Sequence, residues 1–90
     1  MKPVKVNILG MELDEWTHKS CIAHFGVGYN WATLCDIESK EKEKGHATEL
    51  LIEAIKYYEA LNKNFGGSVA LNHKMRNLYQ KLNINEYIED

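Results

Sequence analysis

The stretch ESKEKEKGHATELL (38–51) places one glycine between a run of alternating charges and a segment that becomes apolar. A helix that begins near Gly45 has unpaired N–H groups and partial positive charge in its first turn, and phosphate groups bind such ends. Glycine also lets the backbone approach an anion closely, because it has no Cβ. Lys40, Lys42 and Lys44 add positive charge around the turn. These residues predict a phosphate site; the alternative is a solvated charged surface.

A second group with the residue types for chemistry is His18, Cys21 and His24, spaced three apart. This spacing suggests metal binding, but on a strand an odd spacing alternates between the two faces, so the three side chains do not converge. No second pair of ligands follows at the spacing typical of zinc sites. The sequence therefore predicts no metal site.

The elements that must position Gly45 begin with strands. Apolar and β-branched residues, separated by turns that contain glycine, predict strands over 3–9, 21–27 and 31–39. Residues 11–20 are polar and favour no element.

The period then changes to that of helices. Apolar residues at spacings of three and four predict an amphipathic helix over 46–63, and the Gly66–Gly67 pair is expected to end that segment. SVAL (68–71) is predicted as a short buried strand. Asn72 is a good N-cap for a second helix, and 83–90 is expected to close with a short strand. The inner face of the second helix would carry Met75, Leu78, Tyr79 and Leu82.

The order of these elements predicts a single α/β (α+β) domain over residues 1–90. The strand before the long helix and the strand after it are expected to be parallel neighbours joined by a right-handed crossover. In such units ligands bind at the carboxyl ends of the strands, where the helix begins. Residues 38–48 are therefore the expected site.

Composition narrows the classes of partner. The chain has 90 residues, is 44% hydrophobic and carries a net charge of −2, which does not favour nucleic acid or an acidic membrane surface. No apolar run approaches the roughly 20 residues that span a bilayer, and the N-terminus has no signal-peptide pattern. Two cysteines do not form a disulfide framework, so the cytoplasm is the expected compartment.

Two segments resemble the signatures of the GNAT superfamily, the acyl-CoA-dependent N-acyltransferases. IESKEKEKGHATELL is similar to the pattern V-x-P-E-x-R/Q-x-x-G-x-G/A, with Ile37, Lys42, Gly45 and Ala47 at its key positions. NHKMRNLYQKLNI is similar to N-x-x-A-x-x-L-Y-E-K-x-G-F. Asn72, Leu78, Tyr79 and Lys81 match the second pattern. Lysine replaces Arg/Gln and Ser39-Lys40 replaces Pro-Glu in the first pattern, and Met75, Gln80, Asn83 and Ile84 depart from the second.

The resemblance implies a compact GNAT-like fold with a mixed, mostly antiparallel sheet, one splayed parallel strand pair and two main helices. It also implies acetyl-CoA as the cofactor. The amides of 42–48 would hold the pyrophosphate, the strand edge near Cys35 and Ile37 would pair with the pantetheine arm, and Asn72 would hydrogen-bond that arm. The implied cofactor-binding residues are Cys35, Ile37, Lys42, Glu43, Lys44, Gly45, His46, Ala47, Thr48, Asn72 and Tyr79.

Catalysis would be direct transfer of an acetyl group to a primary amine of a protein or small molecule. Tyr79 matches the general acid of the family, because a phenol is protonated at neutral pH and can donate to a leaving thiolate. The other interpretation of Tyr79 is a core aromatic whose hydroxyl is satisfied locally. On a regular strand, Cys35, Thr33 and Trp31 would share the face of Ile37, and none is a convincing base. His24, on the preceding strand, is then the candidate base, with an ordered water chain as its alternative.

Two further expectations concern activity and assembly. The chain is short for the family it resembles, so the rival function is a non-catalytic acyl-CoA-binding or protein-interaction module with a GNAT-like fold. A short domain leaves strand edges open, and open edges pair, which predicts a homodimer.

Overall fold

The computed structural model describes residues 2–41, 45–68 and 73–86, in which six strands form one sheet in the order β1-β2-β3-β4-β5-β6. The first four strands are antiparallel neighbours, β4 and β5 are parallel, and the short β6 runs parallel to β5. The predicted α+β class and the parallel pair around the long helix are confirmed. The strands are β1 (Val4–Ile8), β2 (Met11–His18), β3 (Cys21–Val27), β4 (Trp31–Ser39), β5 (Asn64–Gly67) and β6 (Asn85–Glu86), and the helices are α1 (His46–Ala60) and α2 (His73–Leu82).

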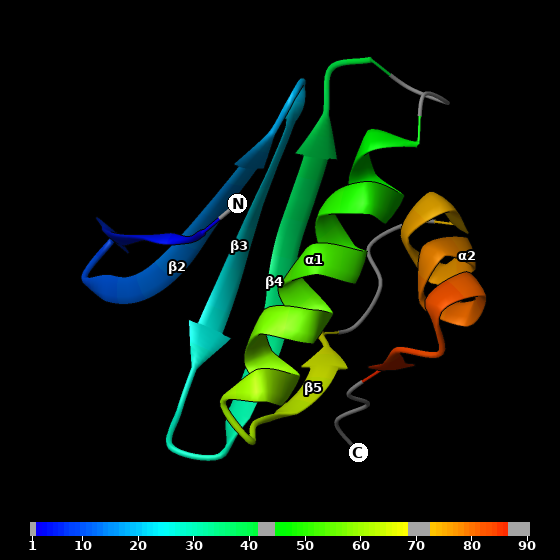
Figure 1. The fold of residues 1–90 in the computed structure, drawn as a ribbon. Helices are drawn as coiled ribbons and strands as arrows, with labels where there is room; N and C mark the ends of the chain where they lie inside the picture. Colours follow the sequence, from blue (N-terminus) through cyan, green and yellow to red (C-terminus); the bar gives the residue numbers. More distant parts are fainter. Residues whose placement is uncertain (1, 42–44, 69–72, 87–90) are drawn as a thin grey trace.

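Helix α1 lies across the sheet in front of β4, and α2 lies beside α1 (Figure 1). The residues of α1 that are buried are Leu50, Leu51, Ala54 and Tyr58. Their spacing is the periodicity that predicts this helix, because residues three and four apart share one face. Trp16 of β2 and Phe25 of β3 are fully buried in the same core cluster, which also includes Met75 and Tyr79 of α2.

The polar stretch that favours no element in the sequence forms β2. Its charge is accommodated because Asp14, only 7% exposed, accepts a hydrogen bond of 2.7 Å from the hydroxyl of Tyr58. Trp16 Nε1 donates to that hydroxyl at 3.1 Å. The three polar groups therefore satisfy one another in the core, which removes most of the cost of burying them.

The strand after α1 is Asn64–Gly67, which lies earlier in the chain than the predicted strand at 68–71. Ser68 lies just beyond the strand, and 69–71 fall outside the described residues. The expectation that Gly66–Gly67 ends the helical segment is wrong, because both glycines lie in this strand. A Cβ at position 67 would lie 2.4 Å from the Cζ atom of Tyr79, so a glycine is needed here. Gly67 therefore marks the place where the ring of Tyr79 packs directly on the backbone of β5.

The remaining boundaries differ slightly from the predictions. The long helix ends at Ala60 instead of residue 63, because Asn62 adopts a positive φ of 60° as the chain turns into β5. Within the predicted C-terminal strand at 83–90, the described residues Asn85–Glu86 form β6. Residues 87–90 and the predicted N-cap Asn72 lie outside the described residues.

Candidate functional site

Strand β4 continues beyond the end of its pairing with β5. The parallel register runs from Trp31–Asn64 to Leu34–Gly67. The last contacts come from Ser68, whose N–H donates to the carbonyl of Leu34 at 2.9 Å and whose hydroxyl donates to that of Cys35 at 3.3 Å. No described strand pairs with residues 36–39 on this side of β4. Those residues therefore offer backbone groups that can bind an extended ligand.

Helix α1 begins a few residues after the end of β4. Its N-cap is Gly45, which has a left-handed φ of 76° and no side chain that could cap the first turn. A Cβ at this position would have no neighbour within 4 Å in the described part of the chain. His46, Ala47 and Thr48 form the first turn, as predicted, while Lys42, Glu43 and Lys44 of the predicted site lie outside the described residues.

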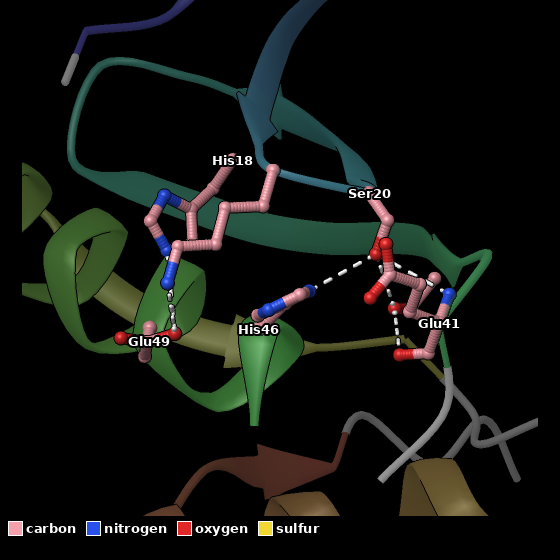
Figure 2. A network of polar contacts seen from close by, with 7 residues as sticks. His18, Ser20, Glu41, His46 and Glu49 are labelled. Carbon is pink, nitrogen blue, oxygen red and sulfur yellow. Dashed lines mark hydrogen bonds and ion pairs between the residues drawn. The ribbon is translucent and has the colours of Figure 1, made fainter. Parts of the chain in front are cut away.

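A network of polar contacts joins this helix start to the turn between β2 and β3, and Figure 2 shows Ser20 at its centre. The hydroxyl of Ser20 lies 3.0 Å from Nδ1 of His46 and 3.4 Å from the hydroxyl of Ser39. It also accepts a hydrogen bond of 3.3 Å from the backbone N–H of Glu41. One serine therefore fixes the end of β4 relative to the first turn of α1.

The first turn also contains an acidic residue, Glu49, which would repel an anion unless its charge were balanced. Its Oε1 lies 3.4 Å from Nε2 of His18 and 3.6 Å from Nζ of Lys19 (Figure 2). The hydrogen bond with His18, followed by the charge of Lys19, lowers the pKa of Glu49. The carboxylate is therefore directed toward His18 and Lys19, and the positive charge of Lys19 offsets part of its charge near the helix start.

Tyr79 approaches the same region from α2, next to the point where β4 and β5 stop pairing. Its side chain is 2% exposed, and its hydroxyl donates a hydrogen bond of 2.9 Å to the carbonyl of Ser68. The ring packs on Gly67 and also borders a surface cavity of about 500 Å³. The phenol therefore lies at the carboxyl end of β5, beside the extension of β4.

A β-bulge in β4 changes which residues share a face. His24 of β3 is opposite Asp36, whereas Phe25 is opposite Leu34, so Cys35 is an extra residue on β4. Ile37 is opposite the buried Ala23, on the helix-covered face, while Cys35 lies against Gly26 on the other face. The expectation that Cys35 and Ile37 share a face is wrong, because it assumed a regular strand.

The bulged cysteine is not set up as a nucleophile. Burial raises the pKa of the Cys35 thiol, a hydrogen bond from the backbone of Gly26 offsets part of that rise, and the charge of Asp36 adds to it. A thiol with a raised pKa is mostly protonated at neutral pH, and the thiolate is the reactive form. Chemistry through a covalent cysteine intermediate is disfavoured at this position.

His24 occupies a carboxylate cluster on the sheet face opposite Tyr79. Its Nδ1 lies 2.8 Å from Asp36 on β4 and its Nε2 lies 2.8 Å from Glu15 on β2. Burial alone lowers the pKa of His24, but the hydrogen bonds and charges of the two carboxylates outweigh it, so the pKa is raised. Both nitrogens face acceptors, which favours the charged imidazolium and disfavours a general base. The structure does not bring His24 and Tyr79 together.

This cluster predicts a pH dependence of stability. Because the folded-state pKa of His24 is raised above its unfolded value, its contribution is present at low pH and is lost as pH rises through the folded pKa. The stability difference between wild type and His24→Gln should therefore shrink between about pH 6 and about pH 9. Urea unfolding of both proteins across this range measures the stability difference. A difference that is constant or grows with pH contradicts the prediction.

Two site residues, Ser20 and Ser68, were missed from the sequence, and Ser39 was given no role although it lies in the expected site at 38–48. Each lies at a strand end or in a turn, where serine is common, so residue type alone gives no signal. Ser20 and Ser39 come together because Cys21 and Ser39 are paired across β3 and β4. Only the strand register, which the sequence does not specify, would have identified them.

Within the described ranges, no group of three or more His, Cys, Asp or Glu side chains could hold a metal ion. Neither described helix has the length and apolar character needed to cross a membrane. Comparison with protein-family models, curated proteins and solved structures gave no match to this chain.

Proposed function

We propose that the protein is a small acyl-CoA-dependent N-acyltransferase of GNAT type, which transfers an acetyl group from acetyl-CoA to a primary amine. One observation carries the proposal. The extension of β4 begins beside the hydroxyl of Tyr79, where two parallel strands stop pairing, and its far end at Ser39 lies next to the first turn of α1, which follows Gly45. These are the positions that the resemblance to the GNAT signatures implies for the pantetheine arm, the pyrophosphate and the general acid.

The physical fit to an acyl-CoA has two parts. An extended amide-containing arm can pair with the edge of residues 36–39, which no described strand covers, as a strand would. A pyrophosphate can accept hydrogen bonds from the first N–H groups of α1, where the helix dipole is positive. The pairing of Glu49 with His18 and Lys19 lowers the negative charge that such a ligand would meet. The arm and the pyrophosphate of the cofactor would therefore follow β4 from its bulge toward the start of α1.

The proposed reaction needs a neutral amine, which attacks the thioester carbonyl and forms a C–N bond as the C–S bond breaks. The departing thiolate takes the proton of the Tyr79 phenol, and the proton lost by the amine restores the phenol through solvent. Before this proton transfer, the Tyr79 hydroxyl must break the hydrogen bond that it donates to the carbonyl of Ser68 in the structure. The raised pKa of Cys35 favours this direct transfer over an acyl-cysteine intermediate.

Cofactor binding tests the proposal. Coenzyme A at ten times its Kd should add about 1.4 kcal/mol to the free energy of unfolding, measured by thermal denaturation. Gly45→Asn should lose this shift, because asparagine tolerates a positive φ but places a side chain where the anion would bind. Gly10→Asn is the matched control, since Gly10 also has a positive φ, of 84°, and open space around its Cβ position. No shift at millimolar coenzyme A, or equal shifts in both variants, contradicts the proposal.

A non-catalytic acyl-CoA-binding module is the second candidate, and a specific observation favours it. The phenol of Tyr79 and both nitrogens of His24 are already engaged by acceptors within the protein. Such a module would be stabilised by coenzyme A in the same way but would not release free thiol from acetyl-CoA when an amine is supplied. Measuring thiol release with lysine-containing peptides separates the two functions.

A further inference from the structure

The outer edge of β1 is the longest edge of the sheet that no described strand covers. A two-residue turn, Leu9–Gly10, joins β1 to β2, and both of its residues have positive φ. In such a hairpin the flanking residues, Ile8 and Met11, form a hydrogen-bonded pair, and hydrogen-bonded pairs then alternate along the strands. It follows that the backbone N–H and C=O groups of Lys5 and Asn7 point outward, away from β2.

These outward groups match a second copy of the same strand. In an antiparallel pair centred on Val6, Lys5 lies opposite Asn7 of the other copy, and the two residues can exchange both of their hydrogen bonds. Val4 lies opposite Ile8 of the other copy, so all five residues of β1 are paired. The strand is therefore complementary to itself in this register.

The neighbouring registers are poorer. Centring the pair on Lys5 places two lysines directly opposite each other, and like charges in that position are destabilising. Centring it on Asn7 leaves Val4 without a partner. Extension beyond Val4 meets Pro3, which has no N–H to donate. Charge and backbone pattern thus select the register centred on Val6.

The side chains of the edge also fit an apolar interface. Val4 is 63% exposed and Ile8 is 39% exposed, on the same sheet face as Val6 and the 57% exposed Met11. Lys5 points to the other face, where its Nζ lies 3.6 Å from both Glu12 and Asp14. Pairing two β1 strands would bring the valine and isoleucine side chains of the two copies together and would leave both ion pairs of Lys5 in place.

We propose that a second copy of this chain binds the outer edge of β1 in antiparallel register about Val6, which makes one continuous sheet across the dimer. The surface is separate from the proposed acyl-CoA site, because β2 and β3 lie between β1 and β4. Dimerisation and cofactor binding are therefore independent, and failure of either leaves the other standing.

Cross-linking tests the register. Val6 lies opposite its own copy in a non-hydrogen-bonded pair, where Cα atoms are about 4.5 Å apart, within disulfide range. In a Cys35→Ala background, Val6→Cys should give a disulfide-linked species of twice 10.4 kDa on mild oxidation. Val4→Cys is the matched control, because its two copies would be about 13 Å apart along the strands. Linkage of both variants, or of neither, would overturn the proposal.

Mass in solution tests the interface without a covalent bond. Light scattering should show a dimer at high micromolar concentration, and Val6→Lys should raise the dissociation constant about tenfold or more, since two lysines would then face each other. Ile22→Lys is the control, because Ile22 is 38% exposed on a central strand and should leave the dimer intact. Amide NMR spectra verify that each variant is folded. A monomeric wild type, or a dimer unaffected by Val6→Lys, overturns the proposal.

Discussion

Replacing Tyr79 with phenylalanine should lower the turnover of acetyl-CoA by roughly 10²- to 10⁴-fold, the range typical of losing a general acid, with little change in KM. The substitution keeps the ring that packs on Gly67 and removes only the hydroxyl that donates to Ser68. If the phenol protonates the leaving thiolate, the loss should appear in kcat and not in the affinity for coenzyme A.

The structural cost of the same change is small. Removing one neutral hydrogen bond should lower the free energy of unfolding by about 1 kcal/mol, so the variant should fold and its turnover can be compared. Tyr57→Phe is the matched control, because Tyr57 packs edge-on against Trp16 on the other side of the core. Turnover in Tyr79→Phe equal to that of Tyr57→Phe would assign the proton transfer to water.

Replacing Gly67 with alanine should destabilise the protein by about 3 kcal/mol, near the upper end of the overpacking range. The new Cβ would lie 2.4 Å from the ring of Tyr79, and the strand cannot retreat easily because β5 is paired with β4 and β6 on its two sides. For a domain of this size the melting temperature should fall by roughly 12–24 °C.

Gly66→Ala isolates the cause of this loss. The two glycines are adjacent in one strand, but among the described residues a Cβ at Gly66 would meet only the backbone oxygen of Asn85, at 3.3 Å. Both substitutions change strand propensity equally, so a much smaller loss in Gly66→Ala attributes the effect to Tyr79. Equal melting temperatures in the two variants would contradict the close packing of Tyr79 on β5.

Long-range contacts explain why the sequence predicts α1 well and β5 poorly. The helix was found because Leu50, Leu51 and Tyr58 repeat with the helical period, and that period is a local property. The strand was misplaced because Gly66–Gly67 has the local signature of a chain break. The reason for Gly67 is the ring of Tyr79, twelve positions along the chain, and no local pattern contains that information.

The site shows the same division. The start of α1 at Gly45 was predicted because a glycine before an amphipathic segment is a local signal. The carboxylate partners of His24 were not predicted from the sequence. Glu15 and Asp36 lie next to His24 only because β2, β3 and β4 pair in the observed registers. The bulge at Cys35 was missed as well, and it reverses the faces of the residues that follow.

Amide NMR of the ¹⁵N-labelled protein during titration with coenzyme A tests the central claim most directly. The account predicts that the largest chemical-shift changes fall on two segments: residues 36–39 at the end of β4, and Gly45 with the first turn of α1. The amides of β1, which β2 and β3 separate from β4, should move little. An unchanged spectrum at millimolar coenzyme A, or shifts concentrated on β1 instead of Gly45, would contradict the account.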